Sequence, residues 1–431
     1  MKKSKSTIFG RSFSLAKMAL DVGVKELRSG DIQSRIEQAK TIAKTLSDLK
    51  GAAMKVGQLL SIDLADYFPE EAAAILSQLQ NNATQEKFEV IQTTLVEELG
   101  KEKLGQYTSI EEVALASASI SQIHRAKLNG LDVVLKVQHR FVADSIENDI
   151  KMLNHLITLL SKFYRKSINF DFMFAEIQTV LTNELDFHYE QKSLLEFQDK
   201  LQRFEYRNKI ILPTVYADYS TKKVLTMSYE SGITLNQWIL NRPNQSEKEK
   251  IARLMLELYC FEFFTVGMVQ TDPNFSNFLI REVEGDLQLV LLDFGATKKY
   301  DQQFIDNYVT LIKSLENDSA DKIIELSIEF GFLNREESPE VQKLYLEMMS
   351  IAIEPFMKCK KVGSFSFSDI EYSKRSNAIL REFITSLKYS APPHQIIFLH
   401  RKLGGLFALL KRLNLELDIY PYWTKMTKQD R

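Results

Sequence analysis

Two acidic residues and an asparagine in the second half of the chain form a pattern that could bind a metal ion. Asp272 and Asn277 are five residues apart in a polar segment, and Asp293 follows an apolar run that ends at Leu292. Hard carboxylate and amide oxygens of this kind suit magnesium. In phosphoryl transfer, an asparagine and a strand-end aspartate bind the metal, while a loop aspartate faces the acceptor. The spacing therefore indicates chemistry on a phosphate group.

Two residues of opposite charge in the first half of the chain complete this set. Lys136 lies in a β-prone run, Val133–Val137, and Glu190 lies in a helical stretch 54 residues later. In kinases, a strand lysine orients the α- and β-phosphates and is held by a helix glutamate. Each residue alone is a weak indication, because a strand lysine is usually a solvated edge residue. The complete set in this order rarely arises by chance. It consists of Lys136, Glu190, Asp272, Asn277 and Asp293-Phe294-Gly295.

The elements that must position these residues can be read from the spacing of apolar residues. The predicted helices cover residues 11–100, 142–200, 246–268 and 300–412. The predicted strands are Ile120–Ile123, Asp132–Val137, Ile210–Leu212, Lys223–Met227, Asn277–Ile280 and Leu287–Leu292. Asn129-Gly130 between the first two strands is a strong hairpin signal. We therefore expect helices, then a small sheet with inserted helices, then a larger helical lobe.

Glycine and proline are scarce, with 16 and 9 among 431 residues, which favours a helix-rich protein. No two glycines have the G-x-G spacing of a dinucleotide site. Gly100 and Gly105 have the spacing of a P-loop, but Gln106 and Tyr107 follow where Lys and Ser or Thr are required. The glycine count alone therefore predicts a protein that does not bind nucleotides.

Charge and cysteine content limit the partners and the compartment. The 55 Lys and Arg nearly balance the 57 Asp and Glu, which argues against a nucleic-acid partner. Two cysteines cannot form a disulfide framework, so we expect a reducing, cytoplasmic location. No apolar run reaches about 18 residues, so neither a transmembrane helix nor a signal peptide is expected.

The first 30 residues carry seven Lys and Arg among apolar side chains. A basic amphipathic helix of this kind could lie on an anionic membrane surface, which would make the protein peripheral to the membrane. The favoured alternative is a first helix that packs into the core and carries a solvated basic tail.

Seven longer motifs surround the candidate residues. They are Lys55–Gln58, Ala116–His124, Val133–Lys136, Asn183–Glu190, Gln270–Asn277, Leu292–Thr297 and Leu399–Gly405. Together they resemble the UbiB family of atypical protein-kinase-like proteins, closest to its coenzyme-Q-associated ATPase branch. The resemblance covers residues 35–412.

The resemblance changes the conclusion drawn from glycine. The family covers the phosphates with an alanine- and serine-rich loop, matched here by Ala116–Gln122. It implies ATP or ADP with Mg²⁺ at a site where Asn277 and Asp293 bind the metal and Asp272 orients the nucleophile. Lys136 would hold the phosphates and Glu190 would position it. The implied nucleotide contacts are Ala116, Ser117, Ala118, Ser119, Lys136, Met227 and Tyr229.

The family also folds a helix with the K-x-G-Q motif over the site, which Lys55 and Gln58 match. The resemblance implies that Lys55 meets the carboxylates of Glu184 and Asp186. If residues 184–190 form one helix, Asp186 and Glu190 share a face, and Glu184 is turned by about 120° from Glu190.

The expected fold is α+β, a bilobal protein-kinase-like fold with an N-terminal helical extension packed over the active site. The expected domains are the extension with the K-x-G-Q motif over 1–104, the kinase-like N-lobe with a helical insertion over 105–229, and the helical C-lobe over 230–431.

The expected function is Mg²⁺-dependent ATPase activity that supports ubiquinone or other isoprenoid-quinone synthesis at a membrane surface. Its implied partners are nucleotide, anionic membrane lipids and quinone-biosynthesis proteins. Two alternatives stay open. One is a kinase for a small molecule or a lipid headgroup, and the other is a lipid-binding scaffold that uses nucleotide only as a conformational switch.

Overall fold

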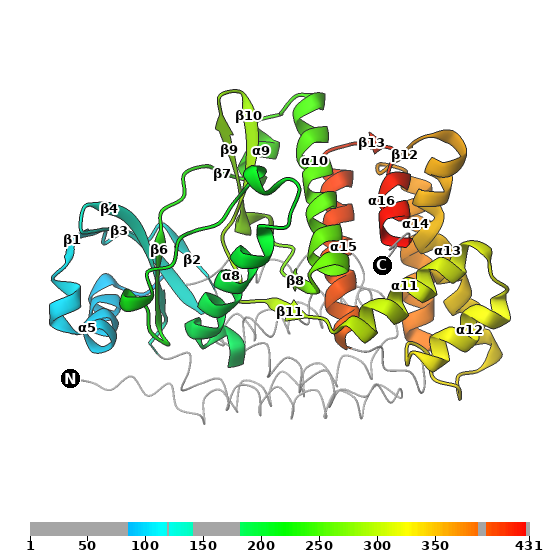
Figure 1. Ribbon diagram of the computed structural model, residues 1–431, viewed down its shortest axis with the longest axis horizontal. Helices are drawn as coiled ribbons and strands as arrows, with labels where there is room; N and C mark the ends of the chain where they lie inside the picture. Colours follow the sequence, from blue (N-terminus) through cyan, green and yellow to red (C-terminus); the bar gives the residue numbers. More distant parts are fainter. Residues whose placement is uncertain (1–84, 119, 141–181, 387–393, 428–431) are drawn as a thin grey trace, which may run out of the picture. The chain divides into compact units, whose positions relative to one another are not determined.

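The computed structural model describes residues 85–118, 120–140, 182–386 and 394–427 (Figure 1). The chain forms two compact units. The first contains the described residues up to Gln191 together with Thr214–Tyr229, and the second contains Lys192–Pro213 and the described residues from Glu230 onward. The predicted helices before residue 85 and over 142–181 lie outside the described residues, as do Lys55 and Gln58.

The first unit is built on an antiparallel sheet with the strand order β1-β3-β4-β6, and β2 pairs with β3. Its strands are β1 (Tyr107–Ile110), β2 (Ala116–Ser117), β3 (Ser121–Leu128), β4 (Leu131–Gln138) and β6 (Val224–Ser228). Between β3 and β4, Asn129 and Gly130 have φ of 50° and 83°. A two-residue hairpin turn of this type needs positive φ at both positions, which Asn and Gly tolerate. The predicted hairpin is confirmed.

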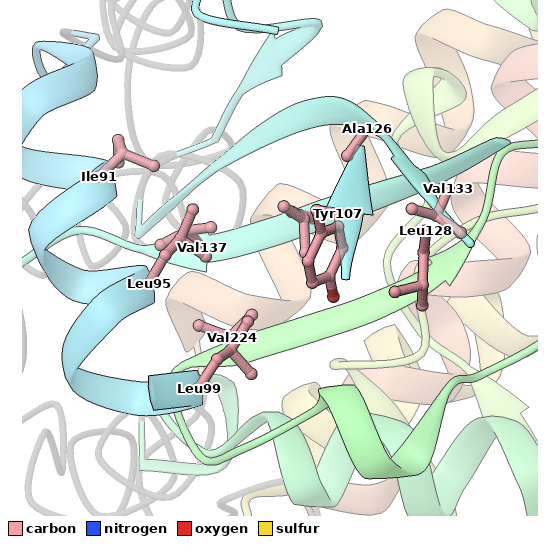
Figure 2. Packing of buried hydrophobic residues seen from close by; sticks show 10 residues of the cluster. Ile91, Leu95, Leu99, Tyr107, Ala126, Leu128, Val133, Val137 and Val224 are labelled. Carbon is pink, nitrogen blue, oxygen red and sulfur yellow. The ribbon is translucent and has the colours of Figure 1, made fainter. Parts of the chain in front are cut away.

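Helix α5 (Phe88–Leu104) packs its apolar residues against one face of this sheet. Ile91, Leu95 and Leu99 recur every four residues and therefore lie on one side of the helix. They meet Val137 of β4 and Val224 of β6 in the core that Figure 2 shows. Because β4 alternates its side chains between two faces, the apolar residues on this face leave Lys136 directed to the other.

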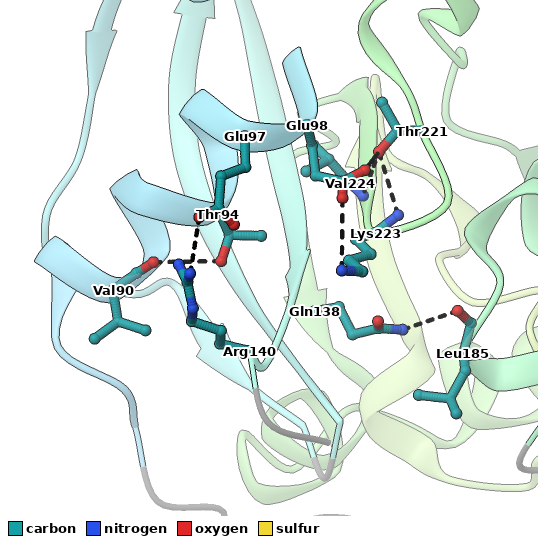
Figure 3. Close-up of polar contacts among 10 residues, drawn as sticks. All are labelled: Val90, Thr94, Glu97, Glu98, Gln138, Arg140, Leu185, Thr221, Lys223 and Val224. Carbon is teal, nitrogen blue, oxygen red and sulfur yellow. Dashed lines mark hydrogen bonds and ion pairs between the residues drawn. The ribbon is translucent and has the colours of Figure 1, made fainter. Parts of the chain in front are cut away.

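Polar contacts join the ends of the same elements (Figure 3). Thr221 Oγ1 donates to Glu98 Oε2 of α5 at 2.7 Å, just before β6 begins. At the end of β4, Gln138 Nε2 donates to the carbonyl of Leu185 at 3.0 Å. Leu185 stands two residues before helix α8 (Phe187–Leu201). This bond therefore fixes the start of α8 relative to β4.

Among the described residues, the second unit contains most of the helices, together with a mixed sheet with the strand order β5-β10-β9-β7. Its helices are α9 (Leu235–Leu240), α10 (Gln245–Cys260), α11 (Gln302–Asn317), α12 (Ala320–Glu329), α13 (Pro339–Val362), α14 (Ile370–Ser386), α15 (His394–Arg412) and α16 (Tyr420–Thr427). Its strands are β5 (Ile210–Ile211), β7 (Ile233–Thr234), β8 (Met268–Gln270), β9 (Phe278–Val283), β10 (Asp286–Leu291), β11 (Thr297–Lys299), β12 (Phe365–Ser366) and β13 (Glu416–Leu417).

An aromatic cluster forms part of the core of the second unit. Phe263 is fully buried and contacts the rings of Tyr300 and Tyr308 edge to face, with centroids 5.1 and 5.3 Å away. Edge-to-face contacts of this kind are the favoured geometry of aromatic pairs. Phe263 lies in a π-helical turn, Phe261–Thr265, that continues α10.

The predicted helix over 246–268 is too long at its C-terminal end. The α-helix ends at Cys260, the π-helical turn ends at Thr265, and Met268 already belongs to β8. Residues 251–270 are mostly buried, so the apolar run continues through three kinds of structure without a change of pattern. No helix in the described part of the chain is both long and apolar enough to cross a bilayer.

The packing of α5 predicts an unequal cost for two neighbouring truncations. Leu95 has no exposed surface, whereas Val96 is 37% exposed. We expect Leu95→Ala to lower the free energy of unfolding by about 2–5 kcal/mol, because it removes buried methyl groups and leaves a cavity. Val96→Ala should change it by less than about 1 kcal/mol. Urea unfolding followed by circular dichroism measures both values, and equal losses would contradict this packing.

Candidate functional site

Lys136 and Glu190 form a buried ion pair in the first unit. The Lys136 Nζ lies 2.8 Å from each carboxylate oxygen of Glu190, and the two side chains are 10% and 4% exposed. Bonds to two oxygens at this distance are charge-assisted and hold both side chains in place. The ring of Phe187 lies 5.4 Å from the same Nζ. The structure thus brings together the lysine and glutamate that the sequence predicts as partners.

The neighbouring strands explain why Lys136 can be held this firmly. β4 pairs with β3 on one side and β6 on the other, so the backbone at Lys136 pairs with Ile123 and Leu225. Glu190 lies in the first turn of α8, whose start is fixed by the Gln138 bond and by the Phe187 N–H, which donates to the Lys222 carbonyl at 3.0 Å.

The alanine- and serine-rich segment is a tight hairpin in which Ala116 and Ser117 are paired as a strand. Ala116 pairs with Ile123 and Ser117 with Gln122. The Ala118 N–H donates to the Ser121 carbonyl at 2.8 Å, which closes the turn. Small side chains permit this close backbone approach without glycine. Ser119 lies outside the described residues.

Met227 and Tyr229, two of the predicted nucleotide contacts, already make contacts within the first unit. Met227 is part of β6, and its side chain packs with Phe187 in a buried cluster. The Tyr229 N–H donates to the Asp132 carbonyl at 3.0 Å, and the Arg125 guanidinium lies 4.2 Å from the centre of the Tyr229 ring. The Tyr229 N–H is therefore already satisfied by a protein carbonyl.

Asp272 and Asn277 lie in the second unit, in the loop that follows β8. The Asn277 side-chain amide donates to Asp272 Oδ2 at 2.9 Å, and the Asn274 N–H donates to Oδ1 at 3.4 Å. Asn274 also caps the short turn Phe275–Asn277 by accepting from the Ser276 N–H at 3.1 Å. The five-residue spacing in the sequence thus corresponds to a direct contact between the two side chains.

Asp293 follows β10 and lies beside this loop. The Leu292 N–H donates to the Asn277 carbonyl at 3.0 Å, and the Gly295 N–H donates to Asp293 Oδ1 at 2.8 Å. Phe294 between them is fully buried and contacts Phe197, with ring centroids 5.2 Å apart. Main-chain bonding and the Phe294 anchor therefore hold Asp293 and Asn277 in adjacent segments.

The oxygens of Asn277 and Asp293 fit a magnesium ion that also binds phosphates. Magnesium usually takes one or two protein carboxylates and completes its shell with phosphate oxygens and water. One carboxylate and one amide oxygen on adjacent segments suit this mode. Within the described residues, no group of three or more His, Cys, Asp or Glu side chains is arranged to hold a metal by itself.

The helix over 184–190 is interrupted, so the condition that these residues form one helix is not met, and the predicted helix over 142–200 is wrong at this point. Residues 182–184 are helical, but the helix breaks at Leu185 and Asp186 before α8 begins. Asp186 Oδ1 accepts from the His188 N–H at 3.0 Å. A short acidic side chain competes well for such free N–H groups at a helix start. The pairing of Lys55 with the carboxylates of Glu184 and Asp186 stays a prediction.

One residue beside the site had no role in the sequence reasoning. Arg401 of α15 places its Nη2 3.6 Å from Asp272 Oδ1. The Leu399–Gly405 motif could have indicated this residue, because an arginine in it lies close to two adjacent glycines.

Comparison with known proteins supports a kinase-like chain. Residues 78–327 match the family model described as the ABC1 atypical kinase-like domain. The probable serine/threonine-protein kinase abkA of Dictyostelium discoideum is 29% identical, over 88% of this chain and 69% of that protein. The mitochondrial atypical kinase COQ8 of Saccharomyces cerevisiae is 30% identical, over 86% of this chain and 72% of that protein.

A solved structure agrees with the fold. The Rv3197 protein of Mycobacterium tuberculosis, in a complex with erythromycin, aligns with a TM-score of 0.61 and 21% identity over 88% of this chain and 93% of that chain. Fold and motifs together define an atypical kinase-like protein. The chain belongs to the ABC1 atypical kinase-like family, which confirms the resemblance to UbiB proteins and the expected α+β kinase-like fold. The predicted domain boundaries stay predictions.

The buried ion pair predicts a large and non-additive effect on stability. Lys136→Met removes the ammonium group that bonds to both oxygens of a buried carboxylate, so we expect a loss of about 3–5 kcal/mol in the free energy of unfolding. Glu190→Gln should cost a similar amount, and the double variant less than the sum. Urea unfolding measures all three.

The matched control is Lys127→Met on the neighbouring strand. Lys127 is half-exposed and lies 3.8 Å from the exposed Asp132. Its loss should cost less than about 1 kcal/mol, as for other surface pairs. Losses that simply add in the double variant would contradict a coupled pair.

Proposed function

We propose that the protein binds Mg²⁺ with ATP or ADP and slowly hydrolyses ATP. The observation that carries this proposal is the buried Lys136–Glu190 ion pair, which fixes the position of a cation of the kind that contacts phosphate oxygens in kinases. The kinase names of the relatives and the order of the motifs support it. Fixed cations are what phosphoryl transfer needs, because the transition state spreads negative charge over the phosphoryl oxygens.

Each candidate residue then has one task. Lys136 holds the α- and β-phosphates, and Glu190 keeps its Nζ in position. Asn277 and Asp293 would hold magnesium, which neutralises phosphate charge when bound. Asp272 orients the attacking oxygen, because Asn277 and the Asn274 N–H already hold its carboxylate.

The ATPase proposal and the kinase alternative differ in the molecule that accepts the phosphoryl group. With water as the acceptor, the protein is an ATPase. With a small molecule or a lipid headgroup as the acceptor, it is a kinase, which the kinase names of the relatives favour. A nucleotide-switched scaffold would bind nucleotide without turnover.

The ATPase proposal is tested by changing one metal-binding aspartate. We expect Asp293→Asn to lower phosphate release from ATP by about 100-fold or more, because it removes the only carboxylate assigned to magnesium. Chelation of magnesium in the wild type should stop phosphate release as well. Steady-state phosphate release measures both.

Asp286→Asn is the matched control. Asp286 is the first residue of β10, the strand that precedes Asp293, and it pairs with Lys209 at the surface. This variant should keep full turnover. Full turnover in Asp293→Asn would show that the assigned site is wrong. Transfer of the γ-phosphate to an added lipid or metabolite, in place of release, would favour the kinase candidate.

We further propose a role in ubiquinone or other isoprenoid-quinone synthesis, at a membrane surface and together with quinone-biosynthesis proteins. The motifs resemble the coenzyme-Q branch, and relatives from yeast and rat are named COQ8 and COQ8B. The basic residues of the first 30 positions support contact with anionic lipids. In this proposal the protein is cytoplasmic and peripheral to the membrane.

A deletion strain tests the pathway role. We expect its isoprenoid-quinone content, measured by mass spectrometry of lipid extracts, to fall, and the wild-type gene to restore it. Asp293→Asn should fail to restore it if turnover is needed, whereas a scaffold would still act. An unchanged quinone profile would separate the protein from this pathway. Liposome co-sedimentation of the full chain and of a chain without residues 1–30 tests the membrane contact. Equal binding by the two would contradict it.

A further inference from the structure

The Leu399–Gly405 motif lies on helix α15 and is not used by the function proposed above. Within the second unit, three of its residues face the segment that carries Asp272. Lys402 Nζ donates to Gln270 Oε1 at 3.2 Å, and Arg401 Nη2 lies 3.6 Å from Asp272 Oδ1. The third residue, Gly405, faces Pro273. Three residues of the helix segment 401–405 thus contact three residues of the segment 270–273.

The contact at Gly405 leaves no room for a side chain. A Cβ added there would lie 2.2 Å from Cβ of Pro273 and 3.4 Å from its Cα. The proline ring cannot turn away, because it is closed onto its own backbone. Any larger residue at position 405 must therefore move the loop or the helix. At Gly404, an added Cβ would meet no atom of the described residues within 4 Å.

A buried ion pair at Lys402 also fixes helix α15. Lys402 Nζ lies 3.2 Å from Glu262 Oε2, and the side chains are 7% and 0% exposed. Burial raises the pKa of Glu262, while the ammonium group of Lys402 acts in the opposite direction. Glu262 belongs to the π-helical turn that continues α10, an irregularity common at functional sites. Lys402 therefore ties α15 both to this turn and to Gln270.

Arg401 completes the restraint on the carboxylate of Asp272. Oδ2 accepts from the Asn277 side chain, while Oδ1 accepts from the Asn274 N–H and faces the Arg401 guanidinium. The Asp272 side chain is 18% exposed and that of Arg401 12%, so the pair is only weakly screened by water. The carboxylate is thus held from both sides.

We propose that helix α15 positions Asp272 for phosphoryl transfer, through the close approach at Gly405 and the charge of Arg401. Arg401 is a positioning residue that acts through Asp272. This inference rests on the role proposed for Asp272. It gives the Leu399–Gly405 motif a function. The motif affects the rate of phosphoryl transfer and leaves the affinity for nucleotide unchanged.

Two neighbouring glycine variants test the proposal. Gly405→Ala should lower kcat for ATP hydrolysis by about tenfold or more, since small misplacements of catalytic groups cost this much. KM for ATP and Kd for Mg·ADP should stay within about twofold, because phosphate and metal ligands are intact. Gly404→Ala makes the same chemical change one residue away and should match the wild type in all three.

The charge of Arg401 is tested by a pair of variants. Arg401→Gln should lower kcat without changing Kd for Mg·ADP, and Arg401→Lys should recover part of the loss, because it restores the positive charge. Equal behaviour of Gly404→Ala and Gly405→Ala would overturn the proposal. A fall in Mg·ADP affinity that parallels the fall in kcat, or an unchanged kcat in Arg401→Gln, would do the same.

A readout without turnover separates this inference from the proposed function. Amide hydrogen exchange at Asn274 should speed up in Gly405→Ala and not in Gly404→Ala, because this amide bonds to the Asp272 carboxylate. Unchanged exchange overturns the positioning role of α15, whatever the activity. Faster exchange in a protein whose wild type shows no ATP turnover contradicts the ATPase function alone.

Discussion

The buried pair of Lys136 and Glu190 is the interaction on which the first unit depends. A charge without its partner at this depth would cost several kcal/mol, so both side chains must arrive in register. That requirement explains why β4 is bonded on both sides and why the Gln138 side chain holds the chain just before α8. The apolar contact between α5 and the sheet, on the opposite face from Lys136, keeps the strands in place.

The second unit meets a similar constraint with hydrogen bonds in place of a single ion pair. Asp272 accepts from Asn277 and from the backbone of Asn274, while Asp293 accepts from the Gly295 N–H. Main-chain bonding across β8 and β11, and from Leu292 to Asn277, joins the two segments. Carboxylates restrained in this way need little reorganisation when a phosphate group arrives, which is the condition for electrostatic catalysis.

Much of this arrangement could be predicted from the sequence, because local patterns specify it. Asn129-Gly130 predicted the hairpin that carries Lys136, and the apolar run up to Leu292 predicted the position of Asp293. The end of α10 could not be predicted, since buried residues continue through the helix, the π-helical turn and β8. The contact of Arg401 with Asp272 joins residues far apart in the chain, and it lies beside the close packing of Gly405 on Pro273.

If nucleotide binds beside Tyr229, as the family resemblance implies, the bond from the Tyr229 N–H to the Asp132 carbonyl has a consequence for inhibitor design. Compounds that mimic adenine often depend on a main-chain donor of the protein. Here that donor is already satisfied by the Asp132 carbonyl, so an acceptor on the ligand would have to displace this bond. A selective compound should therefore carry hydrogen-bond donors that bond to acceptors of the protein, and an aromatic ring directed toward Arg125.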